Sequence, residues 1–341
     1  MREPAKILVV RNDRLGDFML AYPTFLLLKQ ALPDSTIHAL VPGYTREMAL
    51  CCTGVDAVEL DPGSDASTAE QFALLRRMRQ AHYDAVLTLF STTRIGWLTA
   101  AARIPYRLAP ATKIAQLFYN RRLAQRRSRS AKPEYVYNLD LGMKLLADHG
   151  IAEPVLPTPP YLLFADVDVV ALRAEFCRTR GIAPAGRLVF IHPGSGGSAN
   201  NLSVEQYATL ARGLRGRVPF TFVITAGPGE EANATRLETL TEGLPRTVYY
   251  SREGLRRFAQ HIQFADLFIS GSTGPLHIAG ALDRPTAAFY TRRRSATSLR
   301  WQTLNRPERR LAFSPPDTAA EEDMSAIDVT AAAAAISERY L

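Results

Sequence analysis

Apolar and polar residues along the chain alternate in blocks that predict repeated strand–helix units. A first apolar run at 7–10 (ILVV) is followed by the polar segment 11–17 and then by a segment from 18 that we expect to be an amphipathic helix. Similar units continue to the C-terminus, with strong strands predicted at 188–192 and 220–225. Strands that alternate with helices pair in parallel, so the pattern predicts an α/β fold with parallel sheets.

The length and the distribution of proline predict two domains. A chain of 341 residues is longer than a single core usually supports. Four prolines between Pro154 and Pro160 indicate a linker. We therefore predict an N-terminal domain over 1–155 and a C-terminal domain over 156–325. The alanine-rich residues 326–341 are predicted to form a helix that packs back on the N-terminal domain.

The lack of a targeting or membrane-spanning segment and the pattern of cysteines predict a cytoplasmic protein. No apolar stretch approaches the roughly 20 residues that a membrane-spanning helix needs. The N-terminus enters a strand almost at once, unlike a signal peptide. Cys51, Cys52 and Cys177 lack metal-ligand spacing, and we expect reduced thiols and no bound metal.

The net charge of +8 is concentrated in one part of the chain. The stretch 85–133 contains no acidic residue, and we call its basic part, residues 94–132, the basic segment. Its basic and interleaved apolar residues are Arg94, Trp97, Arg103, Tyr106, Arg107, Lys113, Leu117, Phe118, Tyr119, Arg121, Arg122, Arg126, Arg127, Arg129 and Lys132. Such a segment suits an anionic glycolipid, a membrane surface or nucleic acid, or it is simply a solvated basic face. Zinc-finger spacing and RNA-recognition signatures are missing, so we expect no nucleic-acid partner.

Asp17 stands where an α/β protein places its ligands. It follows the first predicted strand through a turn that contains Gly16, and a helix comes after it. Ligands of open α/β sheets bind at the carboxyl ends of the strands. A carboxylate at this place is either a general base or a helix cap, and the local sequence does not decide between them.

Three turns in the second half follow predicted strands and carry small or polar residues. The first contains Gly194, Gly196 and Gly197 with the hydroxyls of Ser195 and Ser198. A strand before it and a helix after it favour phosphate binding by backbone N–H groups, and the alternative is a flexible turn. It is not a P-loop, since no Gly-Lys-Ser/Thr follows.

The other two turns offer a carboxylate and a histidine. Glu230 lies just after a strand, where it either binds ribose hydroxyls or serves as a first-turn acid, and for Glu231 we favour the latter. The third turn presents Ser272, Thr273 and Gly274, with His277 one turn into the following helix. A lone histidine in a helix is often structural, but the neighbouring hydroxyls favour a pocket role.

Four segments together resemble the ADP-heptose:lipopolysaccharide heptosyltransferases of glycosyltransferase family 9. They are RNDRLGD at 11–17, EYVYNLDLGMKLLADHG at 134–150, HPGSGGSA at 192–199 and SGSTGPLHIAGALDRP at 270–285. The last of these is highly specific, and the resemblance covers essentially the whole chain with the segments in order. It implies a GT-B architecture, in which two Rossmann-like domains with parallel sheets face each other across a cleft.

The resemblance also implies an activity and its residues. A heptose or related sugar would pass from a nucleotide diphosphate, with ADP-heptose expected, to a lipopolysaccharide core or similar glycan, with inversion and without metal or other cofactor. Asp17 would be the general base. The acceptor would be an anionic glycolipid or glycan bound by the N-terminal domain at the inner-membrane surface. Its predicted ligands are Asn12, Arg14, Arg94, Arg121 and Arg122. The predicted donor ligands are Ser195, Gly196, Gly197, Ser198, Asn200, Glu230, Ser272, Thr273, Gly274, His277 and Arg292.

The sequence departs from the family pattern at two positions. Asn200 stands where the family usually has Lys or Arg, and Ser272 stands where several members have Asp. We hypothesise that an arginine of the run 292–294 supplies the missing charge to the diphosphate, the alternative being a solvated basic loop.

Two rival interpretations remain. A nicotinamide oxidoreductase would need a G-x-G-x-x-G after the first strand, and the segment 11–17 has one glycine. The other rival is a divergent family member that binds a nucleotide sugar or glycan without transfer, or that uses a different sugar donor. Asn200 favours this rival and Asp17 argues against it.

Overall fold

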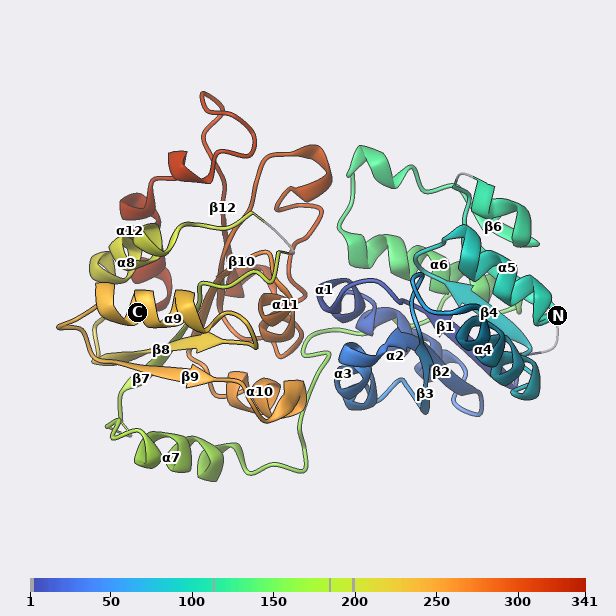
Figure 1. The fold of residues 1–341 in the computed structure, drawn as a ribbon, viewed down its shortest axis with the longest axis horizontal. Helices are drawn as coiled ribbons and strands as arrows, with labels where there is room; N and C mark the ends of the chain where they lie inside the picture. Colours follow the sequence, from blue (N-terminus) through green and yellow to red (C-terminus); the bar gives the residue numbers. More distant parts are fainter. Residues whose placement is uncertain (1–2, 113, 184, 198–199) are drawn as a thin grey trace. The chain divides into compact units, whose positions relative to one another are not determined.

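The fold consists of two α/β units, seen in a computed structural model that describes residues 3–112, 114–183, 185–197 and 200–341 (Figure 1). The predicted donor ligand Ser198 lies outside these residues. The first unit comprises Met1–Arg127 and Ala131–Tyr161, and the second comprises Ser128–Ser130 and Leu162–Leu341. The division after Tyr161 falls at the end of the proline-rich linker, somewhat beyond the boundary that we placed at 155.

The first unit is built on a parallel sheet whose described strands run in the order β3-β2-β1-β4-β5-β6. The strands are β1 Lys6–Val10, β2 Thr36–Pro42, β3 Ala57–Asp61, β4 Ala85–Thr88, β5 Tyr106–Pro110 and β6 Arg121–Leu123. The helices are α1 Leu15–Met19, α2 Tyr22–Ala31, α3 Arg46–Cys51, α4 Thr68–Gln80, α5 Thr93–Ala101 and α6 Glu134–Asp148, with short 3-10 turns η1 Gly43–Thr45 and η2 Ile114–Phe118. A further 3-10 turn, η3 Arg127–Arg129, begins at the last residue of this unit's first segment, and its other two residues are assigned to the second unit. This is the strand order of Rossmann folds.

The single helix expected after Asp17 is instead two helices. α1 ends at Met19 and α2 begins at Tyr22, with Ala21 as its N-cap. Pro23 explains the break, because proline has no N–H to donate to the carbonyl of Met19 four residues earlier. The interruption leaves Asp17 on a helix of little more than one turn, directly after β1.

The second unit repeats this architecture. Its described strands run in the order β12-β11-β10-β7-β8-β9, and every pair is parallel. The strands are β7 Arg187–His192, β8 Phe220–Ala226, β9 Arg246–Tyr250, β10 Leu267–Gly271, β11 Thr286–Phe289 and β12 Arg310–Phe313. The helices are α7 Val169–Thr179, α8 Val204–Gly213, α9 Glu231–Leu240, α10 Gly254–Ile262, α11 Gly274–Ala281 and α12 Val329–Tyr340, with 3-10 turns η4 Arg294–Ala296, η5 Pro307–Arg309 and η6 Met324–Ala326. The predicted α/β fold with two Rossmann-like parallel sheets is thereby confirmed.

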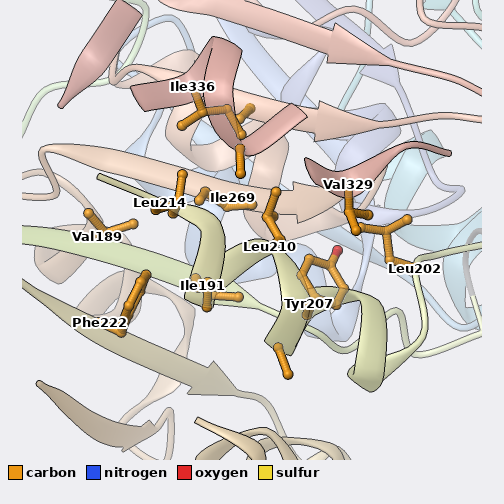
Figure 2. Packing of buried hydrophobic residues seen from close by; sticks show 14 of the residues in the cluster. Val189, Ile191, Leu202, Tyr207, Leu210, Leu214, Phe222, Ile269, Val329 and Ile336 are labelled. Atoms are coloured by element: carbon orange, nitrogen blue, oxygen red, sulfur yellow. The ribbon is translucent and has the colours of Figure 1, made fainter. Parts of the chain in front are cut away.

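The C-terminal helix belongs to the core of the second unit, which corrects our expectation that it packs back on the N-terminal domain. Asp328 caps α12 by accepting hydrogen bonds from the N–H groups of Thr330 and Ala331. Ile336 is fully buried beside Leu210 of α8 and the strands of the second sheet (Figure 2). Burial of such a side chain contributes roughly 1.5–3 kcal/mol, which is enough to fix the helix on this unit.

In each unit, the order in which the chain adds strands to the sheet reverses at one point, and two loops lie there. In the first unit, β1 pairs with both β2 and β4, so the loops after β1 and β4 diverge there. In the second unit, β7 lies between β8 and β10 in the same way. Ligands of such sheets bind at this reversal, at the carboxyl ends of the strands. Over the described residues, no helix is both long and apolar enough to span a membrane.

Candidate functional site

Asp17 lies in the first turn of α1, just beyond the carboxyl end of β1. The helix-cap interpretation is wrong: the N-cap of α1 is Arg14, and no side chain caps the helix. The Asp17 carboxylate instead accepts a hydrogen bond from Arg11, with 2.6 Å between Asp17 Oδ1 and Arg11 Nη2. The Asp17 side chain keeps 15% of its exposure, so a ligand can reach it.

Arg11 is the centre of a buried ion-pair network. Its side chain is 1% exposed, and three carboxylates surround it. Nε donates to Asp13 at 2.9 Å, and Nη1 donates to Glu134 at 2.8 Å. Although burial lowers the pKa of Arg11, the carboxylates raise it above its usual range, so the guanidinium stays charged. A charge in this environment is tolerable only because it is paired on every side.

Helix α6 contributes two further members of this network, Glu134 and Asn138. Glu134 Oε1 accepts from Arg127 Nη1 at 2.7 Å as well as from Arg11, and Arg127 also donates to the carbonyl of Leu89 at the end of β4. Asn138, one turn later, accepts from Arg11 at 3.2 Å and donates to the carbonyl of Leu20. The network therefore joins the loops after β1 and β4, which lie at the point where the strand order of the sheet reverses.

Asp13 is held at an unusual pKa within this network. Burial raises the pKa of Asp13 to about 7, and the Asp17 charge adds to the rise while Arg11 opposes it. The side chain is 15% exposed, and the backbone carbonyl accepts a hydrogen bond from Tyr44 at 2.7 Å. Asp13 is thus a carboxyl that changes charge near neutral pH next to Asp17.

Two of the predicted acceptor ligands, Asn12 and Arg94, meet at a carboxylate that the sequence interpretation missed. Asp61, at the end of β3, accepts hydrogen bonds from Asn12 Nδ2 and from Arg94 Nη2. Burial opposes ionisation of Asp61, but these hydrogen bonds lower its pKa. Arg94 also donates to Gln71 at 2.9 Å. Asp61 therefore fixes both side chains at the same edge of the sheet as Asp17.

The other predicted acceptor ligands do not gather at that edge. Arg14 is exposed at the start of α1. Arg121 lies over the ring of Tyr106 and near Asp148, among residues at the amino ends of β1, β4 and β5. The structure therefore places Arg121 away from Asp17, because β6 presents it at the opposite edge of the sheet. Arg122 is exposed on the same strand.

The glycine-rich turn after β7 closes around a carboxylate from the neighbouring loop. Glu230 Oε1 accepts the N–H of Gly196 at 3.0 Å, and Oε2 accepts the N–H of Gly227 at 2.9 Å. A side chain on Gly194 would come within 2.3 Å of this carboxylate. Gly196 and Gly197 have φ of 50° and 70°, where glycine is favoured. Glu230 is the N-cap residue of α9 but does not cap it, whereas Glu231 is the ordinary first-turn acid that we expected.

His192 completes this arrangement. It ends β7, and its ring bridges two polar partners: Nδ1 lies 3.0 Å from the Thr225 hydroxyl, and Nε2 lies 3.4 Å from Glu230 Oε2. Burial lowers the pKa of His192 despite the nearby carboxylate, which favours the neutral ring. The sequence marked this residue only as the start of the turn.

The third turn precedes a buried histidine whose ring Nδ1 lacks a hydrogen-bond partner among the described residues. Thr273, the N-cap of α11, makes no cap hydrogen bond, and its hydroxyl lies 3.0 Å from that of Ser270. His277 is 2% exposed, and within the described residues its Nδ1 has no hydrogen-bond partner. Burial lowers the pKa of His277 to about 4, so the ring is neutral. Ser272 and Gly274 are partly exposed at the same turn. An unpaired buried ring nitrogen costs free energy, and a ligand would relieve that cost.

Comparison with known proteins identifies the family. A family model described as glycosyltransferase family 9 (heptosyltransferase) matches residues 71–306. The chain belongs to glycosyltransferase family 9. A curated relative from Haemophilus influenzae, described as a putative glycosyltransferase, is 43% identical over 91% of this chain and 89% of its own length.

Two solved structures from E. coli have the same fold as this glycosyltransferase. ADP-heptose lipopolysaccharide heptosyltransferase II superposes with a TM-score of 0.76 at 15% identity, over 98% of both chains. Heptosyltransferase WaaC with ADP superposes with a TM-score of 0.73 at 17% identity, over 98% of this chain and 99% of that one. The predicted GT-B class is thereby confirmed.

Position 200 of the glycosyltransferase carries an uncharged side chain, and the predicted substitute for the missing charge is an arginine of the run 292–294. Asn200 is exposed. Two of the three candidate arginines have protein partners: Arg292 pairs with Asp317 at 2.9 Å and donates to the carbonyl of Ala319, and Arg293 pairs with Glu322 at 3.1 Å. A role for these arginines at a diphosphate stays a prediction, and it requires them to exchange these partners for the ligand.

The neighbouring Asn201 is the residue that shapes the turn of the glycosyltransferase. Its Nδ2 donates to the carbonyls of Pro193 and Gly194, and its Oδ1 accepts from Tyr207 at 2.6 Å. A side chain on Gly271 would come within 2.4 Å of Asn201 Oδ1, so glycine is required where β10 passes the turn. Asn201 thereby links the turns after β7 and β10.

We expect Asn201→Ala to destabilise the protein by about 1–3 kcal/mol, because it leaves buried backbone carbonyls and the Tyr207 hydroxyl without their partner. Asn200→Ala is a matched control, since it removes an identical but exposed side chain and should change stability by less than about 0.5 kcal/mol. Urea unfolding of both variants measures the difference. Equal stability of the two would show that Asn201 does not hold the turn.

Proposed function

We propose that this glycosyltransferase inverts the anomeric centre of its sugar donor and that Asp17 is its general base. The sugar is a heptose or a related sugar, and the acceptor is a lipopolysaccharide core or a similar glycan. The observation that carries the proposal is the placement of Asp17 at the carboxyl end of β1, where Arg11 binds Oδ1. In the described part of the chain, Oδ2 has no hydrogen-bond partner and is available to an acceptor hydroxyl.

The proposed reaction needs one proton acceptor and one stabilised leaving group. Asp17 takes the proton of the acceptor hydroxyl as the hydroxyl oxygen attacks the anomeric carbon from the face opposite the phosphate. The bond from that carbon to the phosphate oxygen breaks, and the nucleoside diphosphate leaves with the electron pair. N–H donors stabilise its charge in this proposal, without a metal or any other cofactor.

The donor belongs, in this proposal, to the turns of the second unit. The N-terminus of α11 offers N–H groups that the Thr273 side chain does not cap, and His277 offers a neutral ring with a free Nδ1. Gly196, Gly197 and Glu230 form the adjacent turn. ADP-heptose is the proposed donor, which is supported by relatives whose solved structures contain ADP and ADP-2-deoxy-2-fluoro heptose.

A thermal-shift screen of ADP-, GDP-, UDP- and dTDP-linked sugars tests this donor. ADP-heptose is expected to raise Tm most, because a ligand that binds only the folded state stabilises it by mass action. His277→Leu should remove the shift. His261→Phe is the control, since His261 is also buried but its Nδ1 already has a partner in Tyr249. A larger shift with another nucleotide, or an undiminished shift in His277→Leu, would refute the assignment.

A second candidate function is binding of a nucleotide sugar or glycan without transfer. Asn200 favours it, because the side chain at this position carries no charge for the leaving diphosphate. Incubation with the sugar that the screen identifies, followed by detection of free nucleoside diphosphate and glycosylated acceptor, separates the two functions. Product formation supports transfer, and tight binding without product supports the alternative.

The proposed acceptor is anionic and sits at the inner-membrane surface, with the protein bound peripherally from the cytoplasm. Support comes from the basic segment, which combines exposed apolar side chains with exposed arginines. η2 packs on α5 through Phe118 against Gly96. The exposed apolar and arginine side chains on and near these helices include Trp97, Ile114, Leu117, Arg121, Arg122 and Arg126. This mixture suits adsorption to an anionic bilayer.

We expect the protein to sediment with vesicles that contain anionic phosphatidylglycerol and not with pure phosphatidylcholine vesicles, and salt should weaken the binding. The double variant Ile114→Ser with Leu117→Ser should reduce it. Val155→Ser and Val170→Ser, also at exposed apolar positions but outside the basic segment, should not. Equal binding to both vesicle types would contradict the proposal.

A further inference from the structure

Two carboxylates, Asp13 and Asp17, each bind one N–H group on the same edge of the Arg11 guanidinium. Nε and Nη2 lie on the same edge of this planar group, and a single carboxylate commonly takes both in a bidentate pair. Here Asp13 Oδ1 accepts from Nε at 2.9 Å and Asp17 Oδ1 accepts from Nη2 at 2.6 Å. The proposed base therefore shares its counter-charge with a second carboxyl on the same edge.

We propose that Asp13 is a positioning residue that sets the base strength of Asp17 by competing with it for Arg11. The inference rests on the proposed role of Asp17 as the base. It assigns Asp13 no contact with the reacting atoms: Asp13 acts through the guanidinium and through its own charge.

The charges around Asp13 leave the network with an excess of negative charge. Its own segment contributes Arg11, Arg14 and Asp17, and α6 contributes Glu134, which also binds Arg127. From η1, the Tyr44 hydroxyl faces the same segment and is bound to the Asp13 carbonyl. Within the buried network, the two guanidinium groups of Arg11 and Arg127 thus face three carboxyl groups, one more than they can neutralise.

The state of Asp13 alters the base in a definite direction. When Asp13 is ionised, it takes part of the Arg11 charge and repels the charge on Asp17, so Asp17 binds a proton more readily and is the stronger base. When Asp13 is protonated, the Arg11 charge is shared by two carboxylates, Asp17 and Glu134, and Asp17 is the weaker base. Because burial raises the pKa of Asp13 to about 7, the exchange between the two states falls near neutral pH.

The proton movements are balanced in this scheme. The acceptor hydroxyl gives its proton to Asp17, which becomes neutral, and no bond to Asp13 forms. Loss of the negative charge on Asp17 then lowers the proton affinity of Asp13 in turn. A base is most effective when its pKa approaches the working pH, so a neighbour that raises the proton affinity of Asp17 improves catalysis.

Carbon NMR of the full-length protein labelled at the aspartate carboxyl carbons tests the coupling without any substrate. Asp17→Asn is expected to lower the titration midpoint of Asp13, because the Asp17 charge adds to the rise in the pKa of Asp13. Asp140→Asn is the control, because Asp140, on α6, pairs with Lys132 and is not one of the carboxylates bound to Arg11. An unchanged Asp13 midpoint in Asp17→Asn would overturn the inference.

The pH profile of kcat/KM, measured with the nucleotide sugar found by the screen, gives the catalytic readout. The wild-type profile should rise through a step near pH 7, and Asp13→Asn should lose that step with little change in KM. A step that persists in Asp13→Asn overturns the inference. Retained turnover by Asp17→Asn would instead refute the proposed base, and the NMR titrations report on the coupling independently of that result.

Discussion

Asp17→Asn is expected to lower kcat by about 10²–10⁴-fold, the range that a positioned general base contributes. Asparagine is isosteric with aspartate and can still accept the hydrogen bond from Arg11 Nη2, so the network around Arg11 is retained. It has no carboxylate to receive the proton of the acceptor hydroxyl. Transfer is measured as release of nucleoside diphosphate under single-turnover conditions, over a range of acceptor concentrations.

Donor affinity separates loss of the base from loss of structure. The dissociation constant of the donor should stay within about twofold in Asp17→Asn, since the proposed donor ligands all lie in the second unit. Asp140→Asn removes the same charge from α6 and should leave turnover unchanged. Wild-type turnover by Asp17→Asn would refute the assignment of this residue as the base.

Arg11→Met should cost about 3–5 kcal/mol of stability, because it removes the cation that Asp13 and Asp17 share and leaves Glu134 paired with Arg127. Methionine fills most of the volume of the arginine side chain, so a cavity is not the main cause. Arg236→Met is the matched control: Arg236 pairs with Glu205 at the surface, with 62% and 53% of the side chains exposed, and its loss should cost less than about 1 kcal/mol. Urea unfolding at pH 7 measures both.

The loss of unfolding free energy in Arg11→Met, relative to wild type, should increase with pH. Arg11 lowers the pKa of Asp13, so its removal raises that pKa further above about 7. A carboxyl whose native pKa exceeds its unfolded value of about 4 stabilises the fold at low pH and loses that contribution as the pH rises. The difference from wild type should therefore be smallest near pH 4–5 and grow toward pH 8. A deficit that is constant over this range would show that the loss is one of packing.

The strands that the sequence predicted best are those with uninterrupted apolar runs. β1 and β7 are almost wholly buried, and their sequences contain little else. β5 and β6 were missed because arginines of the basic segment dilute their pattern, and β9 and β12 each begin with arginine. β6, β9 and β12 are edge strands, which keep part of their surface in water and so tolerate such residues. β5 lies inside the sheet and is mostly buried, so in this strand Arg107 alone interrupts the apolar run.

The loops that carry the candidate residues were predictable from the sequence, and the partners of those residues were not. Glycine-rich turns after apolar strands correctly located the loops that carry Glu230 and His277. Arg11 and Asp13 were within a recognised motif, but their significance depends on Glu134, which lies far along the chain. A buried charge becomes visible only when the fold brings its partners together. A signal was nevertheless present in the Pro133–Glu134 pair, which places a carboxylate at the first turn of a helix.

The C-terminal helix shows why alanine-rich sequence is a poor guide to docking. Its buried face consists largely of Ala332 and Ala333 with Ile336, and small side chains pack on many surfaces. What selects the second unit is local: Ala333 lies against Gly213 at the end of α8, where a larger residue would clash. Such fit between two small residues cannot be predicted from either segment alone.

The Glu230 carboxylate occupies hydrogen-bond donors of the glycine-rich turn in the structure. It already bonds the N–H groups of Gly196 and Gly227, which are the donors that an incoming phosphate would seek. A free phosphate ion must displace this internal anion and regains only the bonds that it breaks. A nucleotide sugar, the proposed donor, can add contacts through its sugar and base that a free phosphate lacks. The turn should therefore discriminate against the inorganic phosphate that is abundant in cells, in favour of the larger ligand that carries the sugar.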